Sequence, residues 1–217
     1  MLEIGSFKGK STVALASVAM RYSSGPVIAV DPHSSPSITD PGAGATGSSW
    51  DDFQASLRAA GVERAVEAHR AYSHDVARGW DRPIRLLWID GDHTYRGAKE
   101  DLELFRAHLA PGGIVALHDV LHMFEGPDRV FAEDILASDV FGPAGLCGSI
   151  GWAQYRPGDG ARWRGARRAL GRRVGRLIPF VKDGREPKGV AKLRYKWWRG
   201  LVPHAAPDPA AWVRAVS

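Results

Sequence analysis

The sequence predicts an α/β fold, a Rossmann-like, doubly wound and mostly parallel sheet with helices on both faces. The first observation is that short apolar segments alternate with segments of helical periodicity, as they do in βαβ units. The second is that the strongest apolar segments end in Gly, Asp or His, and ligands of open α/β sheets bind at such strand ends. The third is composition: 217 residues, 44% hydrophobic and 24% charged, fit one domain with a core plus an extension.

The first part of the chain alternates two strands with two helices. Residues 1–5 are a short apolar strand that ends in a glycine turn, and residues 10–22 contain Ala, Val and Leu as helices packed on a sheet do. Residues 25–33 are a second buried strand. Ser, Pro, Gly and Thr dominate residues 34–49, which predicts a loop. An amphipathic helix with Ser or Asp near its start follows over residues 49–62.

The alternation continues through the middle of the chain. Residues 65–73 are a weak strand and residues 84–90 a strong one. Residues 94–113 form a helix closed by Pro-Gly-Gly, which leads into a strand over residues 113–119. A further helix and a final strand are expected over residues 128–138 and 148–156.

The net charge of +5 hides an acidic body and a basic C-terminal part. Residues 161–200 carry 14 Lys or Arg against Asp183 and Glu186, whereas the remaining residues carry 15 basic and 22 acidic side chains. We therefore expect a folded domain over residues 1–157 and a basic, Trp- and Arg-rich helical extension over residues 158–217.

Nothing in the sequence indicates a secreted or membrane-spanning protein. No apolar run approaches the roughly 20 residues that cross a bilayer, and the N-terminus lacks the pattern of a secretory signal. Cys147 is the one cysteine, which excludes an internal disulfide framework and a multi-cysteine metal site. We expect a cytoplasmic protein.

The glycine turn at residues 5–11, GSFKGKS, is one residue short of a P-loop. The shorter loop offers fewer backbone N–H groups to a phosphate, and the charge of Glu3 would repel one. A nucleotide hydrolase stays an alternative, because Asp90 ends a strand as the metal-binding acid of that class does. Glu3 and Asp31, which end the first two strands, favour a cationic nucleoside whose ribose hydroxyls bind Asp31. S-adenosylmethionine has this chemistry, with a ribose, a sulfonium, an ammonium group and no phosphate.

Four segments in order carry a resemblance to a known family: LEIGSFKGKST, VIAVDPH, LLWIDGDHTYRGAKEDLELFRAHLAPGG and IVALHDV. Together they resemble the class I S-adenosylmethionine-dependent methyltransferases. The most similar branch is that of small-molecule O-methyltransferases, which includes the macrocin O-methyltransferases and the cephalosporin hydroxylase-like proteins. The resemblance covers residues 1–157 and implies methyl transfer to a hydroxyl of a sugar or other small natural product. A degenerate methyltransferase fold that serves as a membrane-surface or interaction module is the alternative.

The resemblance implies a set of residues that bind S-adenosylmethionine at the ends of the strands. The set consists of Glu3, Gly5, Ser6, Phe7, Gly9, Ser11, Asp31, Ser73 and Asp90. Within it, Ser73 corresponds to the position that contacts adenine in the family, although a plain turn serine is equally consistent with the sequence.

The resemblance also implies a catalytic centre with Mg²⁺ or another divalent cation. Asp90, His118 and Asp119 are the implied metal ligands, and His93 is the implied general base that takes the proton of the acceptor hydroxyl. The branch has a second acid or an amide where this chain has His118 and Val120 flanking Asp119. Because histidine favours softer metals than Mg²⁺, the site could hold another cation, hold Mg²⁺ weakly, or contain a neutral, hydrogen-bonded His118. Asp92 either orients His93 or caps the following helix.

The basic extension has three interpretations. Apolar residues at helical spacing over residues 163–178 suit a helix that packs on the body with its arginines in water. An amphipathic, Arg-rich helix also suits peripheral contact with an anionic membrane, to which Tyr195, Trp197 and Trp198 would add interfacial aromatic groups. Nucleic acid is the least favoured partner, because no binding motif accompanies the charge.

The chain begins inside the first strand, whereas methyltransferases of this type have helices before it. This predicts a shortened N-terminus, or a lid supplied by the extension or by a partner subunit, including a second copy in a homo-oligomer.

Overall fold

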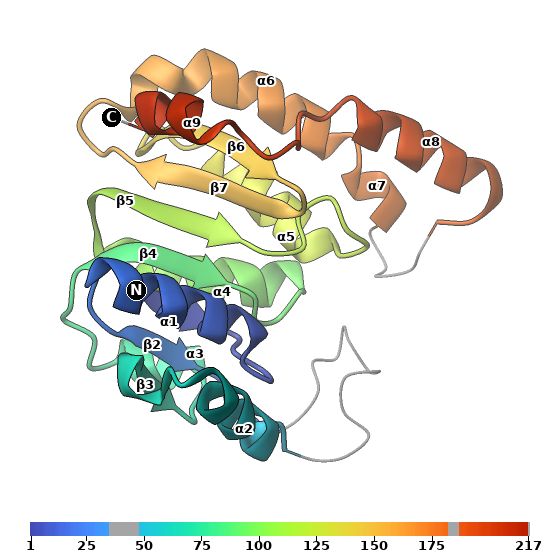
Figure 1. Ribbon diagram of the computed structural model, residues 1–217. Coiled ribbons are helices and arrows are strands. Elements are labelled where there is room, and N and C mark those ends of the chain that lie inside the picture. The colour runs from blue at the N-terminus through green and yellow to red at the C-terminus, as the bar shows by residue number, and fades with distance from the viewer. Residues whose placement is uncertain (35–47, 182–186, 217) are drawn as a thin grey trace.

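The computed structural model describes residues 1–34, 48–181 and 187–216, so the loop predicted over residues 34–49 lies almost wholly outside the described residues. A seven-stranded sheet forms the centre of the molecule, in the order β3-β2-β1-β4-β5-β7-β6 (Figure 1). Its strands are β1 (Leu2–Ile4), β2 (Val27–Val30), β3 (Val66–His69), β4 (Ile84–Ile89), β5 (Leu109–Leu117), β6 (Phe141–Cys147) and β7 (Ile150–Tyr155).

The strands from β1 to β5 pair in parallel, whereas β7 is antiparallel to both β5 and β6. The chain winds outward from β1 to β3 and then returns to continue from β4, so the strand order reverses between β1 and β4. In sheets of this topology ligands bind beside that reversal. The predicted doubly wound, mostly parallel sheet is confirmed.

Helices cover both faces of the sheet (Figure 1). Alternate residues of β2 show the two layers: Val27 and Ala29 pack with Phe53 in one cluster, while Ile28 and Val30 belong to the larger cluster on the other face. The helices are α1 (Lys10–Tyr22), α2 (Trp50–Ala60), α3 (Ser73–Ala77), α4 (Tyr95–Arg106), α5 (Glu125–Arg129), α6 (Arg164–Gly175), α7 (Ile178–Val181), α8 (Gly189–Gly200) and α9 (Pro209–Val216). Short 3₁₀ turns η2 (Glu63–Ala65) and η4 (Gly160–Trp163) and a π-helical turn η3 (Val130–Ile135) complete them.

One strand was not predicted from the sequence: β6, the edge strand beyond β7. Gly142, Pro143 and Gly145 lie within it and look like turn residues in the sequence. An edge strand tolerates them, because Pro has no N–H to donate and one side of an edge strand has no ladder to complete.

The Pro-Gly-Gly at residues 111–113 does not close a helix, as predicted, but lies inside β5. Helix α4 already ends at Arg106. The pairing of β4 with β5 shifts between Ile84 and Leu86, and the extra residues of β5 are accommodated there as an irregularity. The strand therefore begins earlier than the glycines suggest.

The helix predicted over residues 128–138 differs from the prediction in its start and in its type. It starts at Glu125 as α5 and continues as the π-helical turn η3. Val130, Phe131 and Ile135 are all fully buried, because the wider π turn directs residues of this spacing toward the same core.

The basic extension shares the core of the body. Leu170 and Val174 of α6 belong to the large hydrophobic cluster. Arg167 was expected in water, but it is buried, with Nη1 donating to the Gly160 carbonyl at 2.6 Å and Nη2 lying 3.2 Å from Asp139 Oδ1. No helix within the described ranges is both long and apolar enough to cross a membrane.

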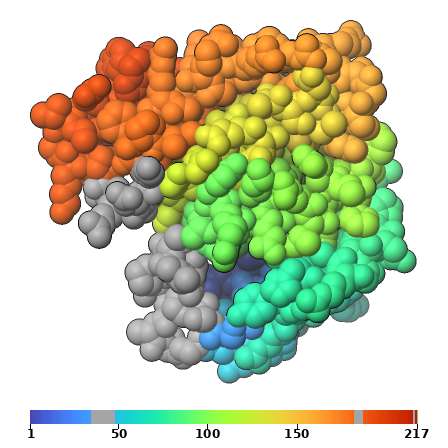
Figure 2. Space-filling view, turned by 180° about the vertical axis from the view of Figure 1, so that it is seen from behind, coloured from blue at the N-terminus to red at the C-terminus, as the bar shows by residue number. Residues whose placement is uncertain are grey.

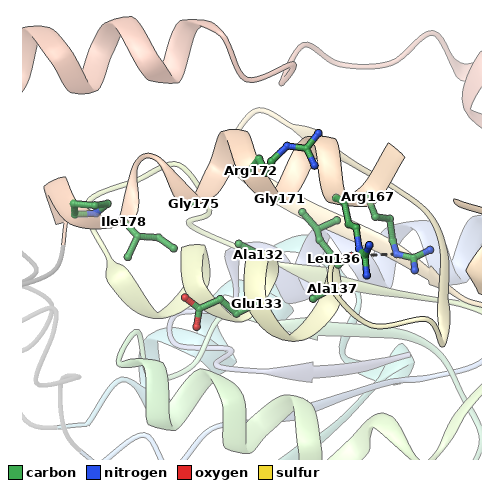
Figure 3. A pocket seen from close by; sticks show the side chains of 11 residues that line it. Ala132, Glu133, Leu136, Ala137, Arg167, Gly171, Arg172, Gly175 and Ile178 are labelled. Atoms are coloured by element: carbon green, nitrogen blue, oxygen red, sulfur yellow. Dashed lines mark hydrogen bonds between the residues drawn. The ribbon is translucent and has the colours of Figure 1, made fainter. Parts of the chain in front are cut away.

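A groove of about 470 Å³ runs between α6 and η3 and is lined by Leu136, Gly171 and Ile178 among other residues (Figure 3). None of the side chains predicted to bind a cofactor or a metal lines this groove.

Candidate functional site

The predicted site residues follow strand ends that the backbone holds together. Gly5 N–H donates to the Val30 carbonyl at 2.9 Å, Asp90 N–H to the Ile4 carbonyl at 2.8 Å, and His118 N–H to the Ile89 carbonyl at 2.9 Å. The residues after β1, β2, β4 and β5 are therefore neighbours at one edge of the sheet. The surface is hollowed in Figure 2 where blue N-terminal residues are seen at the bottom of a recess beside the green middle of the chain.

Gly5 allows β1 and β4 to approach each other at this edge. Its φ is +85°, and a Cβ placed on it would lie 2.1 Å from the Asp90 carbonyl oxygen. No L-residue fits there without moving the backbone that carries Asp90. Gly9, with φ of +84°, makes the left-handed turn that starts α1.

Asp31 holds the glycine turn in place. Its Oδ2 accepts a hydrogen bond from Phe7 N–H at 2.8 Å, and its Oδ1 accepts one from His33 N–H at 2.7 Å. A carboxylate oxygen accepts more than one hydrogen bond, so Asp31 keeps capacity for a ligand hydroxyl. The side chain of Phe7 is 41% exposed beside it, while the hydroxyl of Ser6 is buried without a hydrogen-bond partner among the described residues.

The turn is not a phosphate cradle. Gly5 N–H, Phe7 N–H and Gly9 N–H already donate to the Val30 carbonyl, the Asp31 carboxylate and the Ser6 carbonyl. A P-loop leaves such N–H groups free to surround a phosphate, so the geometry opposes the nucleotide hydrolase alternative.

Glu3 is fully buried beneath α1, where Thr12 Oγ1 donates to its Oε2 and Ser11 supplies a second hydrogen bond. Burial raises the pKa of Glu3 to about 7, although these two hydrogen bonds lower it, and the charges of Asp90 and Asp31 add to the rise. Its Oε1 has no partner among the described residues. Glu3 and Ser11 thus lie behind the turn, on the side of the helix.

The acidic and histidine side chains after β4 and β5 converge. His93 Nε2 lies 3.5 Å from Asp90 Oδ1 and 3.4 Å from Asp119 Oδ2. His118 Nδ1 lies 3.1 Å from Asp90 Oδ1 and 3.2 Å from Asp119 Oδ1. Both imidazoles therefore border the same pair of carboxylates.

The pKa values of this cluster reflect mutual stabilisation of opposite charges. Burial raises the pKa of Asp90, but close contact with the imidazoles of His118 and His93 outweighs it and holds the pKa below its usual range. Close contact with Asp90 raises the pKa of His118 despite partial burial, and the charge of Asp119 adds to the effect.

The cluster also has the donor set of a metal site. Among the described residues, Asp90, His93 and Asp119 each offer a ligand atom within 4.8 Å of the others. Both ring nitrogens of His93 are buried without a hydrogen-bond partner in the part of the chain that the structure describes. An unpartnered imidazole nitrogen between two carboxylates fits a divalent cation, and a mixed N and O set suits softer metals better than Mg²⁺. Two of the three predicted ligands, Asp90 and Asp119, belong to this group, and its third member is His93 rather than His118.

Neighbouring residues fix His93. Its ring stacks on Phe124, with centroids 4.3 Å apart and planes 8° from parallel. Asp92 does not orient His93. Its oxygens accept hydrogen bonds from the N–H and the hydroxyl of Thr94, and Thr94 caps α4 by accepting the Gly97 N–H at 3.1 Å.

Ser73 starts α3 and hydrogen-bonds Asp101 of α4. Burial raises the pKa of Asp101 to about 7 against that hydrogen bond. A Cβ on Gly91 would lie 2.8 Å from Asp101 Oδ2, so this buried carboxyl supports the start of the loop after β4.

Asp128, Tyr195 and Arg199 hold the turn after β5, and none of them was predicted to support the site. Tyr195 was predicted to lie at a membrane interface, but it hydrogen-bonds this turn instead. Asp119 and Leu121 have φ of 59° and 65°, which is unfavourable for residues other than glycine. Leu121 N–H donates to Asp128 Oδ1 at 2.6 Å, while Tyr195 Oη donates to the Leu121 and His122 carbonyls at 2.7 and 2.9 Å. Arg199 Nε adds a hydrogen bond to the Leu121 carbonyl at 3.1 Å.

Comparison with known proteins agrees with this architecture. A family model described as a methyltransferase domain matches residues 2–120, more than half of the chain. The O-methyltransferase NovP has a TM-score of 0.56 at 15% identity, over 72% of this chain and 71% of that chain. CalS11, a TDP-rhamnose 3'-O-methyltransferase of calicheamicin biosynthesis, has a TM-score of 0.53 at 18% identity, over 73% and 72% of the two chains.

An O-methyltransferase from Bacillus cereus, solved in complex with SAH, has a TM-score of 0.52 at 20% identity, over 70% of this chain and 72% of that chain. Identities this low show the fold alone, and the family is shown by the domain match. The resemblance seen in the sequence is therefore confirmed, and the chain belongs to the class I S-adenosylmethionine-dependent methyltransferases.

Proposed function

We propose that the protein transfers the methyl group of S-adenosylmethionine to a hydroxyl of a sugar or other small natural product, with a divalent cation at the acceptor. The observation that carries this proposal is the convergence of Asp90, His93 and Asp119 beside the glycine turn. The names of NovP and CalS11 support the O-methylation and, for CalS11, a sugar acceptor.

Asp31 and the glycine turn bind the nucleoside in this proposal. Asp31 already orients the turn through Phe7 N–H, and its remaining lone pairs accept the ribose hydroxyls. Glu3 lies behind the turn beneath α1, so in this proposal it attracts the positive charge of the cofactor without contacting it. A nearby cation favours the ionised form of this carboxyl, whose pKa burial raises to about 7.

Asp90 and Asp119 would hold the cation. His118, whose Nδ1 lies 3.1 and 3.2 Å from their oxygens, would be the third donor, which assigns His93 to the acceptor instead. When bound, the cation lowers the pKa of an acceptor hydroxyl. His93 Nε2 takes the proton of that hydroxyl as the oxygen attacks the methyl carbon. The bond between that carbon and the sulfonium sulfur breaks, its electron pair stays on sulfur, and S-adenosylhomocysteine leaves, while the carboxylates stabilise the imidazolium.

Calorimetry tests the cofactor. S-adenosylhomocysteine is expected to bind, and ATP is not. ATP binding without S-adenosylhomocysteine binding would overturn the proposal, and binding of neither would favour a non-catalytic interaction module.

The His93→Ala variant tests the catalytic assignment. It is expected to lower turnover by roughly 10²- to 10⁴-fold with little change in S-adenosylhomocysteine affinity, because a general base acts on the acceptor.

Titration with Mn²⁺ separates the two roles that the geometry offers to His93, general base and metal ligand. If His93 is the base, His93→Ala keeps Mn²⁺ affinity and His118→Ala loses it, whereas the reverse pattern assigns His93 as the ligand. Unchanged turnover of His93→Ala would remove it from both roles.

A further inference from the structure

Helix α8 carries a row of exposed apolar side chains along one face. Val190, Leu193, Trp197 and Leu201 are 72%, 68%, 60% and 48% exposed. Their spacing places them on one stripe of a helix. One interpretation of the extension was a helix with its apolar side packed on the body. This holds for α6, whose Leu170 and Val174 are buried, but not for the exposed stripe of α8.

The stripe is not the result of a loosely attached helix. Tyr195 and Arg199, on the opposite side of α8, hydrogen-bond the turn after β5. The Arg176 guanidinium lies 4.4 Å from the centre of a Trp198 ring, which joins α8 to the residues after α6. With one side of the helix fixed to the body, the apolar stripe points away from it, and α8 lies at the periphery of the molecule (Figure 1).

The positive charge around the stripe indicates what kind of surface it binds. Arg194 and Lys196 are exposed on α8 itself, and residues 161–200 carry 14 basic side chains against two acidic ones. The rest of the chain is acidic, with 22 acidic and 15 basic side chains. An anionic surface would therefore attract this end of the molecule and repel the other, which turns α8 toward it.

A second copy of the chain fits less well. Two extensions that met through α8 would bring their excess positive charges together. One exposed face of a 12-residue helix is also small beside the roughly 800 Å² that each partner buries in a stable dimer. A lipid surface needs no matching groove for a protruding helix, because acyl chains and headgroups rearrange around it.

We propose that α8 binds an anionic lipid surface, with Val190, Leu193, Trp197 and Leu201 at the boundary of headgroups and acyl chains and with Arg194 and Lys196 beside the phosphates. This goes beyond methyl transfer and does not depend on it. Because α8 contacts the turn that follows Asp119, such binding places the strand-end site close to the lipid surface.

Co-sedimentation with lipid vesicles tests the proposal on the full chain. The protein is expected to sediment with vesicles that contain phosphatidylglycerol and not with vesicles of phosphatidylcholine alone, and added salt is expected to weaken the binding. The double variant Leu193→Ser/Trp197→Ser should lose at least about tenfold in vesicle affinity, because it removes the apolar part of the contact. The matched control is Val18→Ser/Met20→Ser, which changes two apolar residues of α1 that are each 48% exposed.

Circular dichroism and S-adenosylhomocysteine binding show whether the variants are folded. Three results would overturn the proposal: no binding of the wild-type protein to anionic vesicles, equal binding to neutral vesicles, or equal losses in the α8 and α1 variants. Sedimentation velocity without lipid tests whether a second copy of the chain covers the stripe instead. A wild-type dimer that becomes a monomer in Leu193→Ser/Trp197→Ser would assign the stripe to a second copy.

Discussion

The backbone at Gly5 determines how close the ends of β1 and β4 lie. Gly5→Ala is expected to destabilise the protein and to abolish measurable S-adenosylhomocysteine binding, because its Cβ would lie 2.1 Å from the carbonyl oxygen of Asp90. Either the turn or the loop that carries Asp90 has to move.

Gly25→Ala is the matched control for Gly5→Ala. Gly25 has φ of +84°, almost the same as Gly5, but among the described residues no atom beyond its chain neighbours lies within 4 Å of its added Cβ. This control therefore carries only the conformational cost of a left-handed alanine, about 1 kcal/mol. Thermal melting and S-adenosylhomocysteine calorimetry of both variants separate backbone strain from the clash with Asp90. Equal losses of stability and binding in the two variants would show that the close approach of Gly5 to Asp90 is unimportant.

Single residues also show what the sequence could predict about the site. The edge at which Asp90, His93 and Asp119 lie was predicted from the strand ends, since parallel strands that neighbour each other finish at the same edge. Their roles were implied by the resemblance to the methyltransferases. The direction of Glu3 was not predicted. It alternates with Leu2 and Ile4 along β1, so it faces α1 rather than the hollow above the turn.

At the level of elements, the packing of α8 on the turn after β5 had no signal in the sequence. Tyr195 and Leu121 are 74 positions apart, and no periodicity or local motif connects them. β6 was missed for a different reason, because an edge strand can contain the Gly and Pro residues that mark turns elsewhere. Parallel strands and amphipathic helices were predictable since local patterns determine them.

The contact of α8 with this turn predicts an effect of Tyr195→Phe on the metal site. The variant removes the hydroxyl that donates to the Leu121 and His122 carbonyls. Because Asp119 starts the same left-handed turn, we expect Mn²⁺ affinity and turnover to fall several-fold, along with a loss of about 1 kcal/mol in stability. Tyr22→Phe, on the exposed surface of α1, is the control and should change none of these quantities. Wild-type Mn²⁺ affinity in Tyr195→Phe would show that the extension does not position Asp119.

For the whole molecule, buried carboxyl groups predict how stability depends on pH. Burial raises the pKa of Asp128 to about 8 and the pKa values of Glu3 and Asp101 to about 7. In the unfolded chain these groups lose their protons near pH 4. Between those limits the folded state binds more protons than the unfolded state, so the free energy of unfolding falls as pH rises from about 4 to about 8.

Asp128→Asn isolates one of these groups, because an amide oxygen can still accept the Leu121 N–H that Asp128 Oδ1 accepts at 2.6 Å. Removing one titrating group should make the fall in stability shallower by as much as about 1.4 kcal/mol per pH unit between about pH 5 and pH 7. Urea denaturation at a series of pH values measures this slope, with Asp81→Asn as a control at an exposed position. A slope identical to that of the wild-type protein would mean that Asp128 is already ionised in the folded state at neutral pH. Its charge would then have to be balanced by a cation such as Arg199, which lowers the pKa of Asp128.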